Sequence, residues 1–162
     1  MNIVYNMNDF QLSNVFFLDP KRNIIMDGKF TKIIYSNELI TINGIYFQIL
    51  FSINSIDKLK SVDKFMNKYF MKFIHNDANN NKIINELNKI EAGLIDHYKK
   101  NFSCKKTPVF LLKEQLSTGN VKLYRETPHL NKNSDFIIKI SGIWENNDNI
   151  GITYKFMEVY RL

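Results

Sequence analysis

The sequence predicts a mainly β protein that forms one domain, in which a partly closed barrel of strands carries one main inserted helix. Three observations predict this class. Short apolar runs recur along most of the chain, turn pairs such as Asp-Gly and Asn-Gly separate them, and residues 82–101 show a long helical period. The 162 residues, 44% of them hydrophobic, are enough to bury a core without disulfides. We therefore expect a single domain over residues 1–162.

The first half of the chain predicts an antiparallel meander. Apolar runs rich in Ile, Phe and Tyr alternate there with short polar turns. Asp27-Gly28 and Asn43-Gly44 each stand between two such runs, and this is the strongest short hairpin signal. Ser36-Asn37 supplies a further turn. The expected strands cover residues 14–19, 23–26, 29–35, 38–42 and 45–53.

The middle of the chain predicts one more strand and then the main helix. Residues 64–75 fit an amphipathic helix or a strand, and their density of Tyr, Phe and Ile favours a strand over residues 67–74. An Asn-rich turn is expected over residues 76–81. Apolar residues then recur at three- and four-residue steps, as on the buried face of a helix. That face comprises Ile83, Ile84, Leu87, Ile90, Leu94, Ile95 and Tyr98.

The last third returns to strands, expected over residues 107–112, 120–125, 135–144 and 150–159. The last two alternate apolar and polar residues around a polar turn at residues 146–149, which predicts a long terminal hairpin. Strands dominate, and no strand–helix–strand alternation occurs. A meander, one inserted helix and a closing hairpin indicate a Greek-key barrel of the OB type.

The charge balance favours an anionic partner. The chain carries 22 Lys and Arg against 16 Asp and Glu, a net charge of +6, which suits nucleic acid or an acidic membrane surface. Its single cysteine excludes an intrachain disulfide and fits a reducing compartment, the cytoplasm or the nucleus. The N-terminus lacks the apolar run of a secretory signal, and no apolar stretch reaches the roughly 18 residues of a membrane span.

Signatures of enzymes and metal sites are missing from the sequence. It has no Gly-rich phosphate loop, HExxH, CxxC or GxSxG motif. His75, His97 and His129 show no ligand spacing, and Cys104 beside Lys105 is a weak signal for a nucleophile. We therefore expect neither catalysis nor a cofactor.

The carboxylates do not suggest a catalytic pair either. Glu86 and Glu91 do not share a face of the expected helix. Glu145 and Asp148 fall at the tip of the terminal hairpin, where we expect water around them.

Aromatic and basic residues interleave on the expected strands. Unpaired bases stack on aromatic rings for about 1–3 kcal/mol each, and lysines neutralise the phosphates between them. Residues two apart on a strand share a face, so both kinds can meet one strand of nucleic acid. For stacking we expect Tyr46, Tyr69, Tyr124, Trp144 and Tyr154. For phosphates we expect Lys29, Lys32, Lys68, Lys122, Arg125, Lys139 and Lys155.

The terminal hairpin also carries a resemblance to a known family. Residues 137–156 read IIKISGIWENNDNIGITYKF. This resembles the C-terminal signature of small proteins of nucleo-cytoplasmic large DNA viruses, a K-I-x-G-I-W strand followed by a G-[IL]-T-Y-K strand. Pro20-Lys21, Gly28-Lys29-Phe30 and the strand ending at Tyr35 resemble the family's N-terminal pattern.

The resemblance implies an OB-fold single-stranded-DNA-binding protein of viral replication, distantly similar to those of T7-like phages. Virus-like linear plasmids of the killer type carry comparable replication sets, which implies other replication proteins as partners. The expected function is thus sequence-independent binding of single-stranded DNA in the cytoplasm, with DNA favoured over RNA. Two alternatives stay open: an assembly protein of a virus-like particle, and a small RNA-binding factor. Exposed edge strands also leave a homo-oligomer open.

Overall fold

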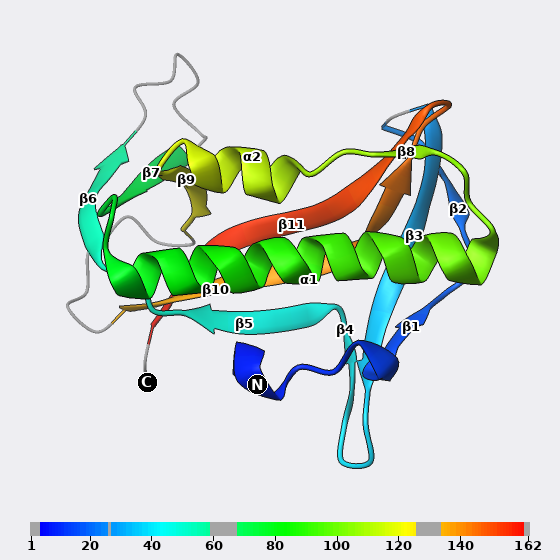
Figure 1. Cartoon of the computed structure of the whole chain (residues 1–162), viewed down its shortest axis with the longest axis horizontal. Helices are drawn as coiled ribbons and strands as arrows, with labels where there is room; N and C mark the ends of the chain where they lie inside the picture. Colours follow the sequence, from blue (N-terminus) through cyan, green and yellow to red (C-terminus); the bar gives the residue numbers. More distant parts are fainter. Residues whose placement is uncertain (1–3, 26, 59–67, 126–133, 161–162) are drawn as a thin grey trace.

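The computed structural model describes residues 4–25, 27–58, 68–125 and 134–160, and Figure 1 shows their arrangement. These residues form one mixed sheet with helices packed on it, so the mainly β class with one main helix is confirmed. The strands are β1 (Val15–Phe17), β2 (Lys21–Asn23), β3 (Gly28–Ser36), β4 (Thr41–Asn43), β5 (Ile45–Ile49), β6 (Ile53–Lys58), β7 (Lys68–Phe73), β8 (Thr107–Pro108), β9 (Asn120–Tyr124), β10 (Ser134–Glu145) and β11 (Asn149–Tyr160). The helices are α1 (Ala78–Phe102) and α2 (Leu111–Ser117), with short 3-10 turns at Met7–Asp9 and Leu12–Asn14.

The predicted terminal hairpin is the spine of the sheet. β10 and β11 pair antiparallel along their lengths, with a bulge between Ile140 and Gly142. The edge of β10 away from β11 pairs with β5 in the first part of β10 and with β3 in its last part. The free edge of β11 pairs in parallel with β8 and β9, and β9 continues to β7 and β6. Segments from both halves of the chain thus meet on this hairpin.

Helices α1 and α2 lie on one face of the sheet (Figure 1). Asp77 caps the start of α1 by accepting the backbone N–H of Asn80, and the helix ends at Ser103 in the left-handed conformation. The predicted apolar face of α1 is buried except at Ile84, which is partly buried. It packs on the sheet together with residues such as Ile138 and Phe156, which are at most 1% exposed. We call the face of the sheet that carries the helices the covered face.

The hairpin predicted at Asn43-Gly44 is wrong. β4 pairs with β3, whereas β5 leaves that edge and pairs with β10. Gly44 makes this corner with φ of +86°, and a Cβ there would lie 2.8 Å from the carbonyl oxygen of Ile140. The turn pair therefore marks a change of partner strand, because β5 pairs with the backbone of β10 over Phe136 to Ile140. The strand predicted over 45–53 also divides, into β5 and β6.

The strand predicted over 107–112 is also largely wrong, because most of that region belongs to α2. Only Thr107 and Pro108 form a strand, and α2 follows with Leu112 and Leu116 buried. The cause is a tertiary contact, since the buried carboxylate of Glu91 on α1 accepts the first backbone N–H groups of α2. The main helix begins at Ala78, earlier than the expected start at residue 82.

The expected closure of the barrel is not seen in the described strands. Their path begins at β1 and ends at β6, and these two end strands do not pair with each other. The sheet is therefore open over the residues that the structure describes. None of the helices in the described ranges is long and apolar enough to cross a membrane.

Candidate nucleic-acid interface

The sheet has a second face, opposite the helices, whose composition follows from the register. Paired residues on neighbouring strands project to the same side, and successive residues project to opposite sides. Ile138 and Phe156 are paired and lie on the covered face. Lys139 and Lys155, also paired, must then project from the opposite side, which we call the open face.

A row of lysines crosses the open face on three adjacent strands. Lys139 on β10 pairs with Lys155 on β11. On β9, Leu123 pairs in parallel with Phe156 of β11. The residues directly before them, Lys122 and Lys155, therefore also stand side by side. Neighbouring strands lie about 4.8 Å apart, so the three lysines occupy adjacent positions across the sheet. We call Lys139, Lys155 and Lys122 the lysine row.

Aromatic residues stand at both ends of the lysine row. Lys139 pairs with Tyr46 on β5, and Lys122 pairs with Phe70 on β7. Phe70 also lines a hollow of about 310 Å³ together with Asp57, Lys58, Lys72 and Asn120. The row therefore runs from one partly buried ring to another across the middle of the sheet.

The lysines of the row contact aromatic rings and form no ion pair with the acids in the described residues. The Lys139 ammonium lies 5.2 Å from the centre of the Tyr46 ring. Those of Lys122 and Lys155 lie 5.2 and 5.7 Å from the Tyr124 ring, which is 46% exposed. Like charges directly across a sheet repel each other. An uncompensated row of three therefore favours an anion bound over it.

Two further predicted residues lie on this face. Lys32 is exposed on β3 opposite Gly142, and Trp144 lies on β10 opposite Gly151. The Trp144 indole N–H donates to the carbonyl of Ile152 at 3.1 Å, and a Cβ on Gly151 would clash with the ring. The indole is therefore held against β11, and one edge of it is committed to the fold.

Lys68 occupies an open-face position of β7, where it pairs with Tyr124. Its side chain lies outside the described part of the structure.

Four of the predicted residues lie on the covered face. Tyr69 is 6% exposed, and the Arg125 guanidinium lies 4.3 Å from its ring. Arg125 also pairs with Glu158, and both side chains are almost fully buried. This pair stabilises the fold on the covered side of the sheet. The burial of Arg125 and Tyr69 leaves little surface for the phosphate contact and the base stacking predicted for them.

Tyr154 and Lys29 complete this group. The Tyr154 hydroxyl donates to Gln115 Oε1 at 2.7 Å and contacts the carbonyl oxygen of Leu111 at 3.2 Å, which ties β11 to α2. Burial, together with the negative charges of Glu91 and Glu114, raises the pKa of Tyr154. Lys29 is exposed, but its register partner is Glu145, so it belongs to the covered side at the end of the sheet.

Three buried carboxylates on the covered side, Glu91, Glu145 and Glu158, were not expected to be buried. Glu145 is only 9% exposed, although its place near a hairpin tip predicts a solvated carboxylate. Burial opposes its charge, but hydrogen bonds from Lys106 and Tyr98 and the charges of Lys106 and Lys29 lower the pKa of Glu145. For Glu91 the sequence does hold a signal, since it falls between Leu87 and Leu94 on the apolar stripe of α1.

The lysine row and the buried carboxylates therefore lie on opposite sides of the sheet. Among the described residues, the open face has the lysine row together with Lys21, Lys32 and Lys72, and its acids are Asp135 and Asp57. Asp57 pairs with Lys72 at 2.8 Å. The covered face holds the buried carboxylates. Within the described ranges, no group of His, Cys, Asp and Glu has the geometry of a metal site.

Comparison with known proteins adds no assignment, because no family model, curated protein or solved structure matches this chain.

Proposed function

We propose that this protein binds single-stranded DNA on the open face of its sheet, without sequence preference and without catalysis. The observation that carries the proposal is the lysine row, three lysines on adjacent strands that form no ion pair with acids in the described ranges and have aromatic rings at both ends. Phosphates along the row would release counterions, and bases would stack on exposed rings.

The arrangement favours single strands over duplex. The rings of Tyr46 and Tyr124 lie beside the ammonium groups, so a bound phosphate brings its neighbouring base to a ring. Only an unpaired base offers a free π-face for this contact. Stacking and charge accept any base, which supports binding without sequence preference. When a base stacks on Tyr124, Lys122 and Lys155 are released from that ring toward phosphates.

The finer assignment is also a proposal: an OB-like protein of viral or virus-like plasmid replication, acting in the cytoplasm. The C-terminal signature of the viral resemblance lies in β10 and β11, and three of its residues, Lys139, Trp144 and Lys155, occupy open-face positions. The distinctive sequence thus coincides with the proposed binding surface. This coincidence supports the proposal independently of the overall charge.

The test is a titration of labelled oligo-dT, oligo-U and duplex DNA at several salt concentrations. We expect oligo-dT to bind most tightly, duplex most weakly, and the affinity to fall steeply as salt rises. Tighter binding of oligo-U would replace DNA by RNA as the ligand. Absence of binding at low salt, with salt-insensitive self-association, would point instead to an assembly protein.

A double variant, Lys139→Ala with Lys155→Ala, tests the surface itself. Each lysine removed from a phosphate contact should lower the slope of log affinity against log salt by about 0.7. The matched control removes Lys89 and Lys100, which are exposed on α1 and already paired with Glu86 and Asp96. Equal salt slopes for both double variants and the unmodified protein would contradict the assignment of the lysine row.

A further inference from the structure

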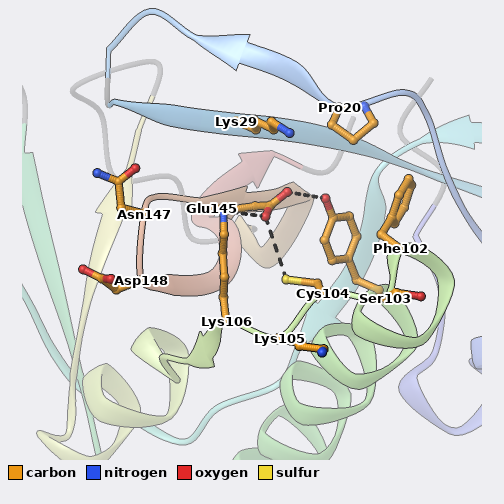
Figure 2. Close-up of a pocket in the computed structure, with 11 residues that line it drawn as sticks. Pro20, Lys29, Phe102, Ser103, Cys104, Lys105, Lys106, Glu145, Asn147 and Asp148 are labelled. Atoms are coloured by element: carbon orange, nitrogen blue, oxygen red, sulfur yellow. Dashed lines mark hydrogen bonds and ion pairs between the residues drawn. The ribbon is translucent and has the colours of Figure 1, made fainter.

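A separate pocket of about 660 Å³ opens at the end of the molecule where α1 terminates. Figure 2 shows its walls: the end of α1 and the segment after it, the start of β3, and the turn between β10 and β11. It lies on the covered side of the sheet, since Glu145 and Lys29 line it. It is therefore distinct from the lysine row.

The interior of the pocket is polar and held in place by hydrogen bonds. Glu145 Oε1 accepts the Tyr98 hydroxyl at 2.7 Å, and Thr31 contacts the same hydroxyl at 3.1 Å. Glu145 Oε2 pairs with the Lys106 ammonium at 2.9 Å. The charge of Lys29 also acts on this carboxylate, so the single negative charge of Glu145 is shared by two lysines.

Two further lysines, Lys29 and Lys105, line the pocket and form no ion pair with described acids. They stand on opposite sides of Glu145 in Figure 2. Asp148 also lines the pocket, so its lining holds three lysines against two carboxylates. The excess of positive charge favours an anionic ligand.

The pocket also has an apolar wall. Phe102, the last residue of α1, is 40% exposed and lines the pocket with Pro20. An exposed aromatic ring beside free ammonium groups suits a ligand with a planar ring and a negative charge. Asn147 adds an amide that can donate and accept hydrogen bonds.

We propose that this pocket binds one nucleotide, with the base against Phe102 and the phosphate attracted by the charges of Lys29 and Lys105. The nucleotide can be free or can be the phosphorylated end of a strand, because both present the same chemistry. The site does not depend on the lysine row. It assigns to Lys29, which the sequence placed with the other phosphate contacts, a role at the opposite side of the sheet.

Cys104 makes the test direct. It lines the pocket, its thiol lies 3.8 Å from Glu145 Oε2, and it is the single cysteine of the chain. The rate at which a thiol reagent modifies Cys104 therefore reports occupancy. The rate is measured with dTMP, with thymidine, with inorganic phosphate and without ligand.

At a dTMP concentration about ten times its Kd, we expect modification to slow about tenfold, because only the unoccupied pocket reacts. At equal concentrations, thymidine and phosphate should each protect less. The double variant Lys29→Ala with Lys105→Ala should weaken protection by dTMP roughly tenfold or more. The control is Lys100→Ala, whose lysine is exposed on α1 and does not line the pocket.

Absence of protection by millimolar dTMP would overturn the proposal, and so would equal protection by phosphate alone. Protection must also persist in the Lys139→Ala, Lys155→Ala variant, which separates this site from the open face. A 5′-phosphorylated oligonucleotide that protects better than its 5′-hydroxyl form identifies a strand end as the ligand. Protection by dTMP alone identifies a free nucleotide.

Discussion

At the scale of single residues, two tyrosines show how the position on a strand decides the role. Tyr124 follows Lys122 by two residues and Tyr154 directly precedes Lys155, so the sequence alone gives both tyrosines a basic neighbour and no difference in role. Tyr124 is 46% exposed and its ring lies near two ammonium groups, whereas the Tyr154 hydroxyl is bonded to α2. Alternation predicts that neighbours face opposite ways, but it does not say which side the helices cover.

Replacing these tyrosines should separate binding from stability. Tyr124→Ala removes a stacking platform and should weaken oligo-dT binding by roughly 5- to 100-fold in fluorescence anisotropy. Tyr154→Phe should leave that affinity unchanged and lower the free energy of unfolding by about 1 kcal/mol, because it removes a hydrogen bond. The reverse pattern would show that the open face is misassigned.

At the scale of elements, the main helix and the terminal hairpin follow from local sequence, whereas α2 does not. The period of α1 and the alternation of β10 and β11 are local properties that burial then satisfies. Residues 107–112 read as a strand, yet Leu111 to Ser117 form a helix because Glu91 accepts the N–H groups of Leu112 and Lys113 at 3.0 and 2.9 Å. That carboxylate stands on α1, some twenty residues earlier in the chain.

The helix α2 should therefore depend on Glu91. Glu91→Ala leaves two N–H groups of α2 without an acceptor, one of them buried, and should lower the free energy of unfolding in urea by about 2–4 kcal/mol. The control Glu86→Ala, at a largely exposed pair with Lys89, gains the same helix propensity and should cost at most about 1 kcal/mol. Equal costs for the two variants would refute the dependence.

At the scale of the whole molecule, the sheet separates two electrostatic environments. Carboxylates such as Glu145 lie beneath the helices with dedicated partners, while the lysine row faces outward. The net charge of +6 does not reveal this division. It arises because the covered face accepts a charge only with a partner, whereas the open face leaves its cations available.

The acid stability of the molecule should reflect Glu145. Its pKa is lower in the folded state than its ordinary value of 4.5, so its stabilising effect is complete above that value and disappears as the pH falls through the folded-state pKa. In urea unfolding at pH 7, Glu145→Gln should cost about 1–3 kcal/mol. The difference from the unmodified protein should shrink as the pH falls below 4.5. A cost that is constant with pH would contradict a charged Glu145 in the fold.

The sequence by itself determined the β-rich class, the main helix, the terminal hairpin and the basic character of the chain. These depend on short-range periodicity and composition, which survive any arrangement of the elements. The tertiary structure decided which strands pair, as at Gly44, and which side of the sheet the helices cover. It thereby placed Lys122, Lys139 and Lys155 in one row and enclosed Tyr69 and Arg125. Both outcomes rest on contacts between residues far apart in the chain, for which local sequence carries no signal.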